Sequence, residues 1–189
     1  MLRKLRENCV GIAGAGGLGS NCAVSLARVG VGKLIIADFD VVTQSNLNRQ
    51  YFFKDQIGEK KVFALEKNIK RINPDVIVEA HEIKLNSESV VSLFKNCDVI
   101  VEAFDLAEMK QMIIETVLRE MREKYIVSGI GLAGWGNNNL IKTQQIGKLY
   151  ICGDNLTEVS EEHPPLAPRV GIVANMQANQ VLEILLNIL

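Results

Sequence analysis

The sequence has 189 residues, which at roughly 150 residues per domain predicts a single domain over residues 1–189. Its 21 basic and 22 acidic side chains leave a net charge of −1, so no strongly basic surface is expected for nucleic acid or an anionic membrane. The 48% hydrophobic content excludes a disordered chain, and no apolar run reaches the roughly 20 residues that span a bilayer.

Four cysteines are spread along the chain without a CxxC pair. Their spacing supports neither a disulfide framework nor a four-cysteine zinc site. The short apolar stretch near the start runs directly into glycines, which is not the pattern of a cleaved signal peptide. We therefore expect a reduced, cytoplasmic protein that holds no zinc.

Short apolar runs alternate with segments of helical periodicity from residue 8 to residue 128. The pattern predicts strands at 8–13, 33–37, 76–80, 99–103 and 125–128. Helices are expected at 18–29, 58–72, 87–95 and 108–122, the second stopped by Asn73-Pro74 and the third capped by a serine. This alternation predicts an α/β, Rossmann-like fold with a mainly parallel sheet and helices on both faces.

The pattern changes after residue 128. Residues 129–136 are a glycine-dense loop, and two short strands at 140–145 and 148–152 are expected to be joined by a tight turn at Gly147. The polar, proline-bearing stretch 153–169 predicts a long surface loop. The last segment, 170–189, predicts a helix. The sheet is thus extended by a short antiparallel β section and a C-terminal helix.

A glycine-rich loop lies between the first predicted strand and the first helix. Gly14, Gly16, Gly17 and Gly19 fit the pattern GxGxxG. Glycines allow the backbone to approach a phosphate, and amides at a helix N-terminus bind it. Asp38 ends the second strand at about the spacing from which a carboxylate holds ribose hydroxyls. We therefore predict a nucleotide-binding site, and these residues alone leave an NAD-dependent oxidoreductase open.

The segment that begins at Asp38 indicates which kind of nucleotide-binding protein this is. It reads DFDVVTQSNLNRQ over 38–50 and GEKK over 58–61, and further on the chain has RINP over 71–74 and APRVG over 167–171. Together with the glycine loop and Asp105, these motifs resemble the ThiF/MoeB/HesA family, relatives of the ubiquitin-activating enzymes. The resemblance covers nearly the whole chain and is greatest to the short ThiF branch of thiamine biosynthesis. It implies an adenylyltransferase that uses ATP to activate the C-terminal glycine carboxylate of a ubiquitin-like sulfur carrier protein ending in Gly-Gly.

The resemblance also assigns roles at the ATP site. Asp38 would hold the ribose, Asn46 and Arg49 the phosphates, and Lys61 would neutralise the phosphate charge. Asp105 would bind Mg²⁺ or orient the reacting groups. The nucleotide-binding residues implied in this way are Gly14, Gly16, Gly17, Gly19, Asp38, Asp40, Ser45, Asn46, Arg49, Lys61 and Asp105, of which Arg49, Lys61 and Asp105 would be catalytic.

The chemistry of adenylylation agrees with these roles. A C-terminal carboxylate is already ionised at neutral pH, so its attack on the α-phosphate needs no general base. The reaction needs cations on the phosphate oxygens and in-line positioning instead. Arg suits multi-point contact with phosphate, and Lys supplies a point charge. His81 and His163 are expected to be structural or surface residues.

Three other functions stay open from the sequence. An NAD-dependent oxidoreductase would leave Arg49 and Lys61 without a purpose. A nucleotide-binding regulator or scaffold would have no need to retain Asp38, Arg49, Lys61 and Asp105 together. An activator of another carrier, in molybdopterin or cysteine biosynthesis, is the third, because no motif identifies the carrier.

Two features of the family have no clear counterpart in the motifs. Many relatives carry, before the first strand, a helix whose arginine reaches the partner subunit's ATP. Here Arg3 and Arg6 precede the strand, but neither matches a motif. Some relatives also form a covalent intermediate on a cysteine beyond the nucleotide fold. Cys152 stands at such a place, although a cysteine in a short strand is more often a small core residue.

A homodimer is expected from the end of the chain. The predicted final helix is apolar on most of its sides, and such a helix has to be covered. Family members dimerise, which the resemblance makes relevant here. The apolar residues that exceed what one face of a small sheet can cover are Ile184, Leu185, Ile188 and Leu189.

Overall fold

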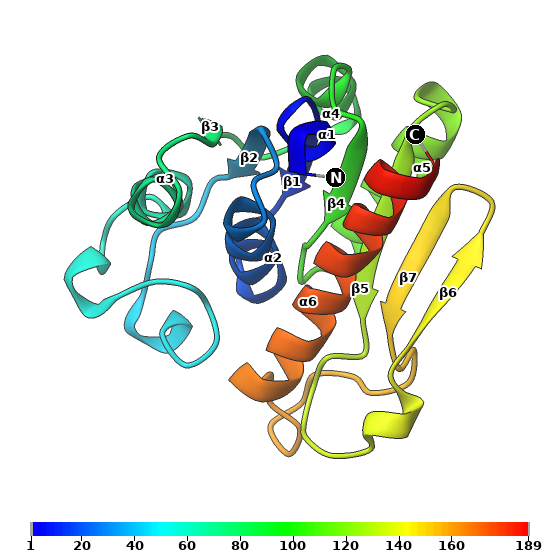
Figure 1. Ribbon diagram of the computed structural model, residues 1–189. Helices are drawn as coiled ribbons and strands as arrows, with labels where there is room; N and C mark the ends of the chain where they lie inside the picture. The colour runs from blue at the N-terminus through cyan, green and yellow to red at the C-terminus, as the bar shows by residue number, and fades with distance from the viewer. Residues whose placement is uncertain (1, 189) are drawn as a thin grey trace.

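The computed structural model describes residues 2–188 and is built around one seven-stranded sheet (Figure 1). The strand order is β3-β2-β1-β4-β5-β7-β6. The strands are β1 Cys9–Ala13, β2 Lys33–Asp38, β3 Ile77–Glu82, β4 Val99–Glu102, β5 Tyr125–Ile130, β6 Lys142–Ile146 and β7 Leu149–Gly153. Neighbouring strands are parallel except for the antiparallel pair β6–β7. The predicted α/β fold is confirmed.

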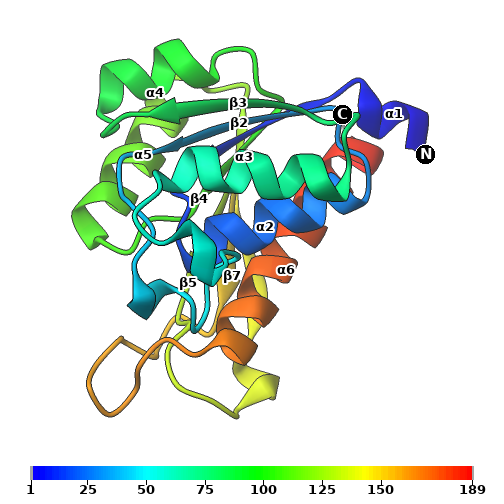
Figure 2. The same cartoon turned by 90° about the vertical axis from the view of Figure 1, so that its left-hand side faces the viewer.

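Helices cover both faces of the sheet. They are α1 Leu2–Arg6, α2 Gly17–Arg28, α3 Lys61–Ile72, α4 Ser87–Phe94, α5 Ala107–Glu120 and α6 Ala167–Glu183, which a π-helical turn, Ile184–Ile188, continues. Short 3₁₀ turns lie at Gln44–Asn46, Lys54–Gln56 and Asn138–Leu140. Figure 2 shows α2, α3 and α6 on one side of the sheet and α4 and α5 on the other. Within residues 2–188, no helix is long and apolar enough to cross a membrane.

The central strands are near-continuous apolar runs because helices bury both of their faces. Successive side chains of a strand point to opposite faces. Ile12 and Val101 belong to the core beneath α2 and α6, whereas Ala13 and Ile100 belong to the core beneath α4 and α5. The sheet therefore separates two apolar cores. Alternate residues of β1 and β4 contribute to one core or to the other.

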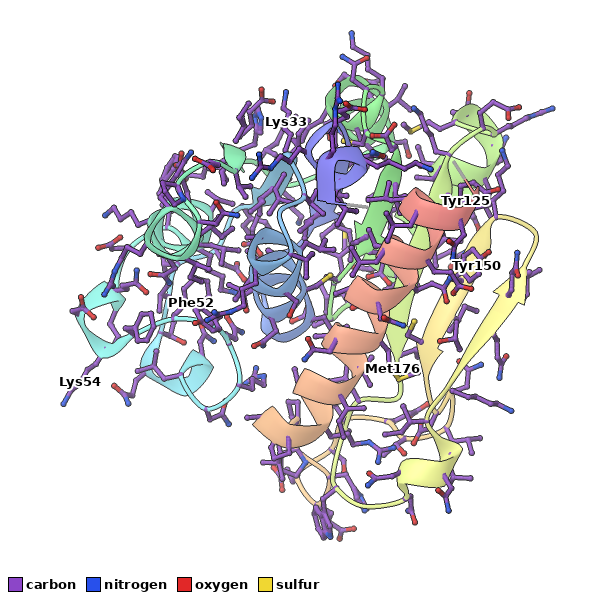
Figure 3. All side chains as sticks on the ribbon, in the orientation of Figure 1. Lys33, Phe52, Lys54, Tyr125, Tyr150 and Met176 are labelled. Carbon is purple, nitrogen blue, oxygen red and sulfur yellow. The ribbon has the colours of Figure 1, made fainter. Side chains whose placement is uncertain are left out.

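The β6–β7 hairpin extends the sheet beyond β5. Gly147 forms the predicted tight turn with a φ of +59°. β7 pairs with β5 in parallel, and Tyr125 and Tyr150 lie next to each other with ring centroids 6.3 Å apart (Figure 3). This parallel pairing joins segments that are far apart in sequence, and the local pattern of the hairpin did not predict it.

Several element ends differ from the prediction for local reasons. α3 starts at Lys61 rather than at residue 58. Gly58 has a φ of +92°, and the backbone of Gly58 and Glu59 forms hydrogen bonds with Val42 instead of continuing a helix. The cap of α4 is Asn86 rather than a serine. Its side chain accepts a hydrogen bond from the backbone N–H of Ser89 at 2.8 Å, which satisfies an amide of the first turn.

The N-terminal helix α1 was not predicted, since it is too short to show a periodic pattern. Leu5 is buried, and Lys4 Nζ donates a hydrogen bond to the backbone oxygen of Leu186 at 3.2 Å. α1 therefore packs against the end of α6, inside the same chain.

The C-terminal helix is also covered differently from the expectation. Ile184 and Leu185 are fully buried within the chain, so they supply no reason for a partner subunit. The side chain of Ile188 and the whole of Leu189 lie outside the described residues. The homodimer stays a prediction, and it no longer rests on this helix. α6 itself starts at Ala167 because Pro168 favours the first turn of a helix.

A buried ion pair between Asp154 and Arg169 holds the long loop before α6. Arg169 Nη2 contacts Asp154 Oδ2, and Arg169 Nη1 donates to the backbone oxygen of Gly136 at 2.5 Å. Burial alone would raise the pKa of Asp154, but hydrogen bonds from Thr157 and Leu156 and the Arg169 charge lower it below its usual value. The pair thus connects the glycine-dense loop, the end of β7 and the start of α6.

We predict that Asp154→Asn lowers the free energy of unfolding at pH 7 by about 3–5 kcal/mol, because the Arg169 charge is left buried without its partner. A folded-state pKa below the unfolded value of about 3.9 stabilises the protein above that value. The stabilisation is lost as the pH falls through the folded-state pKa. Urea unfolding at several pH values measures both effects.

The matched control is Glu123→Gln, which removes the exposed partner of Lys148 and should have a much smaller effect. The difference between Asp154→Asn and the original protein should shrink below about pH 4. A difference that stays constant over the whole pH range would contradict the assignment.

Candidate functional site

The carboxyl ends of β1, β2 and β4 meet at one edge of the sheet, at the lower side of Figure 1. Ala13 pairs in register with Ala37 of β2 and with Glu102 of β4. The next residues stay joined, since the N–H of Gly14 donates to the oxygen of Ala37 at 2.8 Å. Ligands of open parallel sheets bind beyond the carboxyl ends of the strands, so this edge is the candidate site.

The glycine loop between β1 and α2 is packed too closely for side chains at two of its positions. Gly14 has a φ of +98°, and a Cβ on Gly19 would lie 1.8 Å from the backbone oxygen of Gly14. α2 begins at Gly17, and no side chain of the described residues caps it at Gly16. The N–H groups of its first turn are therefore open to an anionic ligand.

Asp38 is fixed against this loop. Its Oδ2 accepts a hydrogen bond from the N–H of Ala15 at 2.6 Å, and its Oδ1 accepts one from the N–H of Asp40 at 2.7 Å. Each carboxylate oxygen can accept a further hydrogen bond. The carboxylate is thus held rigidly at the end of β2, and its role in holding the ribose stays a prediction.

Arg49 lies against the glycine loop. A Cβ on Gly17 would be 3.6 Å from Arg49 Cγ, so the stem of the arginine covers this glycine. Its guanidinium Nη1 donates to the backbone oxygen of Ser45 at 3.2 Å and to Asn48 Oδ1 at 2.8 Å. Both acceptors are uncharged, which leaves the positive charge of Arg49 free to attract a phosphate.

Two residues of the first turns of α2 hold the Arg49 segment in this place. Asn21 Nδ2 donates to the backbone oxygen of Arg49 at 2.9 Å, and Ser20 Oγ accepts from the N–H of Tyr51 at 3.0 Å. Ser20 is fully buried. The sequence analysis did not identify either residue. The available signal was a pair of polar residues directly after the glycine motif, at the start of the helix.

Ser45 and Asn46 lie on the 3₁₀ turn before Arg49. Asn46 Oδ1 accepts a hydrogen bond from the N–H of Thr43 at 3.0 Å, and Ser45 Oγ is 2.9 Å from Thr43 Oγ1. In this structure both side chains close the turn. Their predicted contacts with phosphate stay a prediction.

Lys61 is the first residue of α3, and its side chain is only 8% exposed. Its Nζ lies 2.8 Å from Asp40 Oδ2, and its N–H donates to the backbone oxygen of Asp40 at 3.0 Å. Asp40 is half exposed. The ammonium group is thus held by the carboxylate of Asp40, which lies two residues after Asp38 in the chain.

Asp105 is exposed in the loop between β4 and α5. The preceding residues of this loop, Ala103 and Phe104, lie over Gly14. Mg²⁺ is usually bound through one or two carboxylates together with substrate phosphates and water, so a single exposed carboxylate at this edge fits the predicted role. In the described part of the chain, no group of three or more His, Cys, Asp or Glu side chains could hold a metal ion by itself.

Gln50 was quoted in the motif but given no role. It is 9% exposed, and its Oε1 has no hydrogen-bond partner among residues 2–188. Its Nε2 would lie 3.8 Å from a Cβ on Gly16. The buried side-chain amide of Gln50 therefore lies at the glycine loop. Its place in the site follows from its closeness to Gly16 and not from the motif.

Cys152 lies on β7 and is fully buried. Burial raises the pKa of its thiol to about 11. A thiol in this environment stays protonated at neutral pH, and the thiolate is the nucleophilic form. The structure therefore gives Cys152 the properties of a core residue.

Comparison with known proteins identifies relatives over the whole described chain. The model of the ThiF family matches residues 1–188. The adenylyltransferase and sulfurtransferase UBA4 of Candida albicans is 30% identical, covering 96% of this chain and 43% of that protein. The adenylyltransferase and sulfurtransferase MOCS3 of Caenorhabditis briggsae is 31% identical, covering 96% of this chain and 46% of that protein. The chain thus spans less than half the length of these relatives.

Solved structures share the fold. The E. coli tRNA N6-threonylcarbamoyladenosine dehydratase TcdA, in complex with AMP, has a TM-score of 0.87 at 19% identity, covering 97% of this chain and 88% of that chain. E. coli MccB with ATP has a TM-score of 0.71 at 23% identity, covering 97% of this chain and 57% of that chain. At these identities the likeness establishes the architecture alone.

We predict that Gly17→Val weakens ATP binding about tenfold or more. A Cβ on Gly17 would already lie 3.0 Å from Val170 Cγ1 and 3.6 Å from Arg49 Cγ, so the added methyl groups displace the arginine. Overpacking of this kind typically costs about 1–3 kcal/mol, and about 1.4 kcal/mol is tenfold in affinity. Calorimetric titration with ATP measures the change.

Gly171→Ala is the matched control, because a Cβ at Gly171 meets no atom within 4 Å. It should bind ATP like the original protein. Unchanged ATP affinity in a folded Gly17→Val variant would show that Arg49 does not act from this position.

Proposed function

The chain belongs to the ThiF family, and we propose that it adenylylates the C-terminal glycine carboxylate of a ubiquitin-like sulfur carrier protein ending in Gly-Gly, with release of pyrophosphate. The observation that carries the proposal is the position of two cations, one against the glycine loop and one beside the segment that follows β2. The side chain of Arg49 covers Gly17. The buried Lys61 is paired with Asp40, which lies two residues after Asp38 in the chain. The names of the relatives, both adenylyltransferases, support the same reaction.

In the proposed reaction the ionised carboxylate of the carrier attacks the α-phosphate of ATP. The new bond is a mixed anhydride, and pyrophosphate leaves with the electron pair of the broken P–O bond. Negative charge on the phosphate oxygens rises in the transition state, and Arg49 and Lys61 act on that charge. Mg²⁺ bound with the nucleotide would neutralise part of the phosphate charge, and Asp105 would hold it.

Asp38 has a different part in this mechanism. Ribose contacts hardly change during the reaction, so they stabilise the ground state and the transition state alike.

Lys61 has to exchange at least part of its contact with Asp40 for a phosphate oxygen. Asp40 is exposed enough to be solvated when this happens. Cys152 has no part in this step.

For the carrier we propose a ThiS-like protein of thiamine thiazole biosynthesis, acting in the cytoplasm. Its support is the resemblance of the chain to the short ThiF branch, including the segment APRVG at the start of α6. Carriers of molybdopterin or cysteine biosynthesis are the alternatives. The NAD-dependent oxidoreductase is less well supported, since it explains neither the buried Lys61 nor the two adenylyltransferase relatives.

ATP–pyrophosphate exchange, measured with and without a ThiS-like carrier ending in Gly-Gly, tests the proposal. Arg49→Ala and Lys61→Ala should each reduce the exchange rate at saturating ATP by about 100-fold or more, because each removes a preorganised cation worth on the order of 3 kcal/mol. Asp38→Ala should mainly raise the KM for ATP. Asp105→Ala should lower turnover and change the dependence on magnesium.

Lys67→Ala is the control for the loss of a cation on α3, because Lys67 is exposed and pairs with Glu59 on the surface. It should exchange normally. A carrier that lacks the last glycine should not support exchange. Near-normal exchange in Lys61→Ala with ATP saturating would contradict the adenylylation mechanism as assigned here.

We also propose that the chain forms a homodimer, as the resemblance implies. Sedimentation equilibrium at micromolar concentration should give twice the chain mass of 20.9 kDa. A monomeric mass under these conditions would contradict this proposal, and it would leave the adenylylation proposal in place.

A further inference from the structure

Glu102, the last residue of β4, is a fully buried carboxylate at the end of an otherwise apolar strand. A charge buried in this way is costly unless it is paired and hydrogen-bonded. Neither the glycine motif nor the other ATP-site motifs include it. Its position is nevertheless close to the site, because Glu102 is paired with Ala13 and precedes the loop that carries Asp105.

Both oxygens of the Glu102 carboxylate are satisfied. Oε1 accepts a hydrogen bond from the backbone N–H of Phe104 at 2.7 Å and one from Lys110 Nζ at 3.0 Å. Oε2 accepts from the same Lys110 Nζ at 3.0 Å and from Ser128 Oγ at 2.5 Å. The carboxylate therefore binds the loop after β4, the first turn of α5 and the neighbouring strand β5 at once.

Lys110 extends this network. Its side chain is 18% exposed, and Nζ also donates to the backbone oxygen of Gly129 at 2.9 Å. On the other side of the strand, Gln177 Nε2 of α6 donates to the backbone oxygen of Glu102 at 2.8 Å. The end of β4 is thus held from α5, β5 and α6.

These contacts fix both ends of the loop 103–106. Phe104, directly before Asp105, donates to Glu102, while Lys110, in the first turn of α5, pairs with the same carboxylate. The side chain of Leu106 does not cap α5, and the Lys110 contact ties the start of this helix to β4. Asp105 itself is exposed, and its place is set by the loop.

We propose that the Glu102–Lys110 ion pair is a positioning device that holds Asp105 at the nucleotide. The proposal rests on the proposed function, since it concerns the magnesium-linked role of Asp105 in that reaction. An apolar pair of similar volume would often stabilise a fold as well as a buried ion pair does. What the ion pair adds here is a fixed direction for the Phe104 N–H and therefore for the next residue.

The test compares Glu102→Gln, Asp105→Asn and the double variant that carries both changes. Each is titrated with ATP in the presence of magnesium and in the presence of a chelator, and then assayed for exchange with the ThiS-like carrier. Glu102→Gln should lose most of the magnesium-dependent gain in ATP affinity and reduce turnover about 10- to 100-fold, the size of effect that small misplacements cause. The KM for the carrier should change little.

The double variant separates positioning from stability. If Glu102 acts through Asp105, Glu102→Gln should have little further effect on magnesium dependence or turnover in the Asp105→Asn background. Effects that multiply in the double variant would overturn the proposal.

Lys110→Arg, which keeps the charge, should retain most of the magnesium dependence. Lys110→Met combined with Glu102→Gln leaves no buried charge, and it replaces Glu102→Gln if that variant does not fold.

The control for general destabilisation is Val117→Ala, a buried apolar change on the same helix. Compared at a temperature where both variants are equally folded, Val117→Ala should keep its magnesium dependence. The same loss in Val117→Ala as in Glu102→Gln would overturn the proposal.

The outcome stays separable from the proposed function. If the original protein shows no exchange with any carrier, the proposed function fails, but magnesium-dependent ATP binding still tests the positioning. Hydrogen exchange at the amide of Phe104 provides a ligand-free measurement. Glu102→Gln should reduce its protection, and unchanged protection would overturn the proposal.

Discussion

The close packing of α2 against the end of β1 is the constraint on which the rest of the structure depends. A Cβ on Gly19 would lie 1.8 Å from the backbone oxygen of Gly14, so the helix must begin directly on the turn. This places the first amides of α2 at the carboxyl edge of the sheet without a side-chain cap. Ser20 and Asn21 then anchor the segment that carries Arg49, and Val170 of α6 lies close to Gly17. The tight turn therefore determines where α2, the Arg49 segment and the start of α6 lie.

The charged groups at this edge are held in two ways. Asp38 is bonded to backbone N–H groups, which fix its direction without neutralising it. Arg49 is bonded to uncharged oxygens, whereas Lys61 is paired with the carboxylate of Asp40. In the proposed reaction, a triphosphate would compete with Asp40 for the buried ammonium group. Of these two cations, Arg49 is therefore the one that an anion can approach without displacing a carboxylate.

The sequence was sufficient for the parallel part of the fold because buried strands and amphipathic helices alternate at regular intervals from β1 to β5. It also indicated Arg49, Lys61 and Asp105 by motif, although no contact tests their roles. It failed where the decisive contact is distant in sequence. The β5–β7 pairing, the burial of Ile184 against the same chain and the amide of Gln50 at Gly16 all depend on such contacts. α1 was missed for another reason, since it is too short to show a period.

Two buried ion pairs lie at the functional end of the molecule, and each joins a loop to the first turn of a helix. Glu102–Lys110 ties the loop of Asp105 to α5, and Asp154–Arg169 ties the glycine-dense loop to α6. Exposed pairs lie at both ends of the strands, Lys33–Glu79 near the amino ends and Lys60–Glu82 near the carboxyl ends. Exposed pairs contribute little to stability, and buried pairs often contribute no more than apolar residues would. The two buried pairs are therefore better explained by geometry than by stability, because each of them holds a loop at the carboxyl edge in one position.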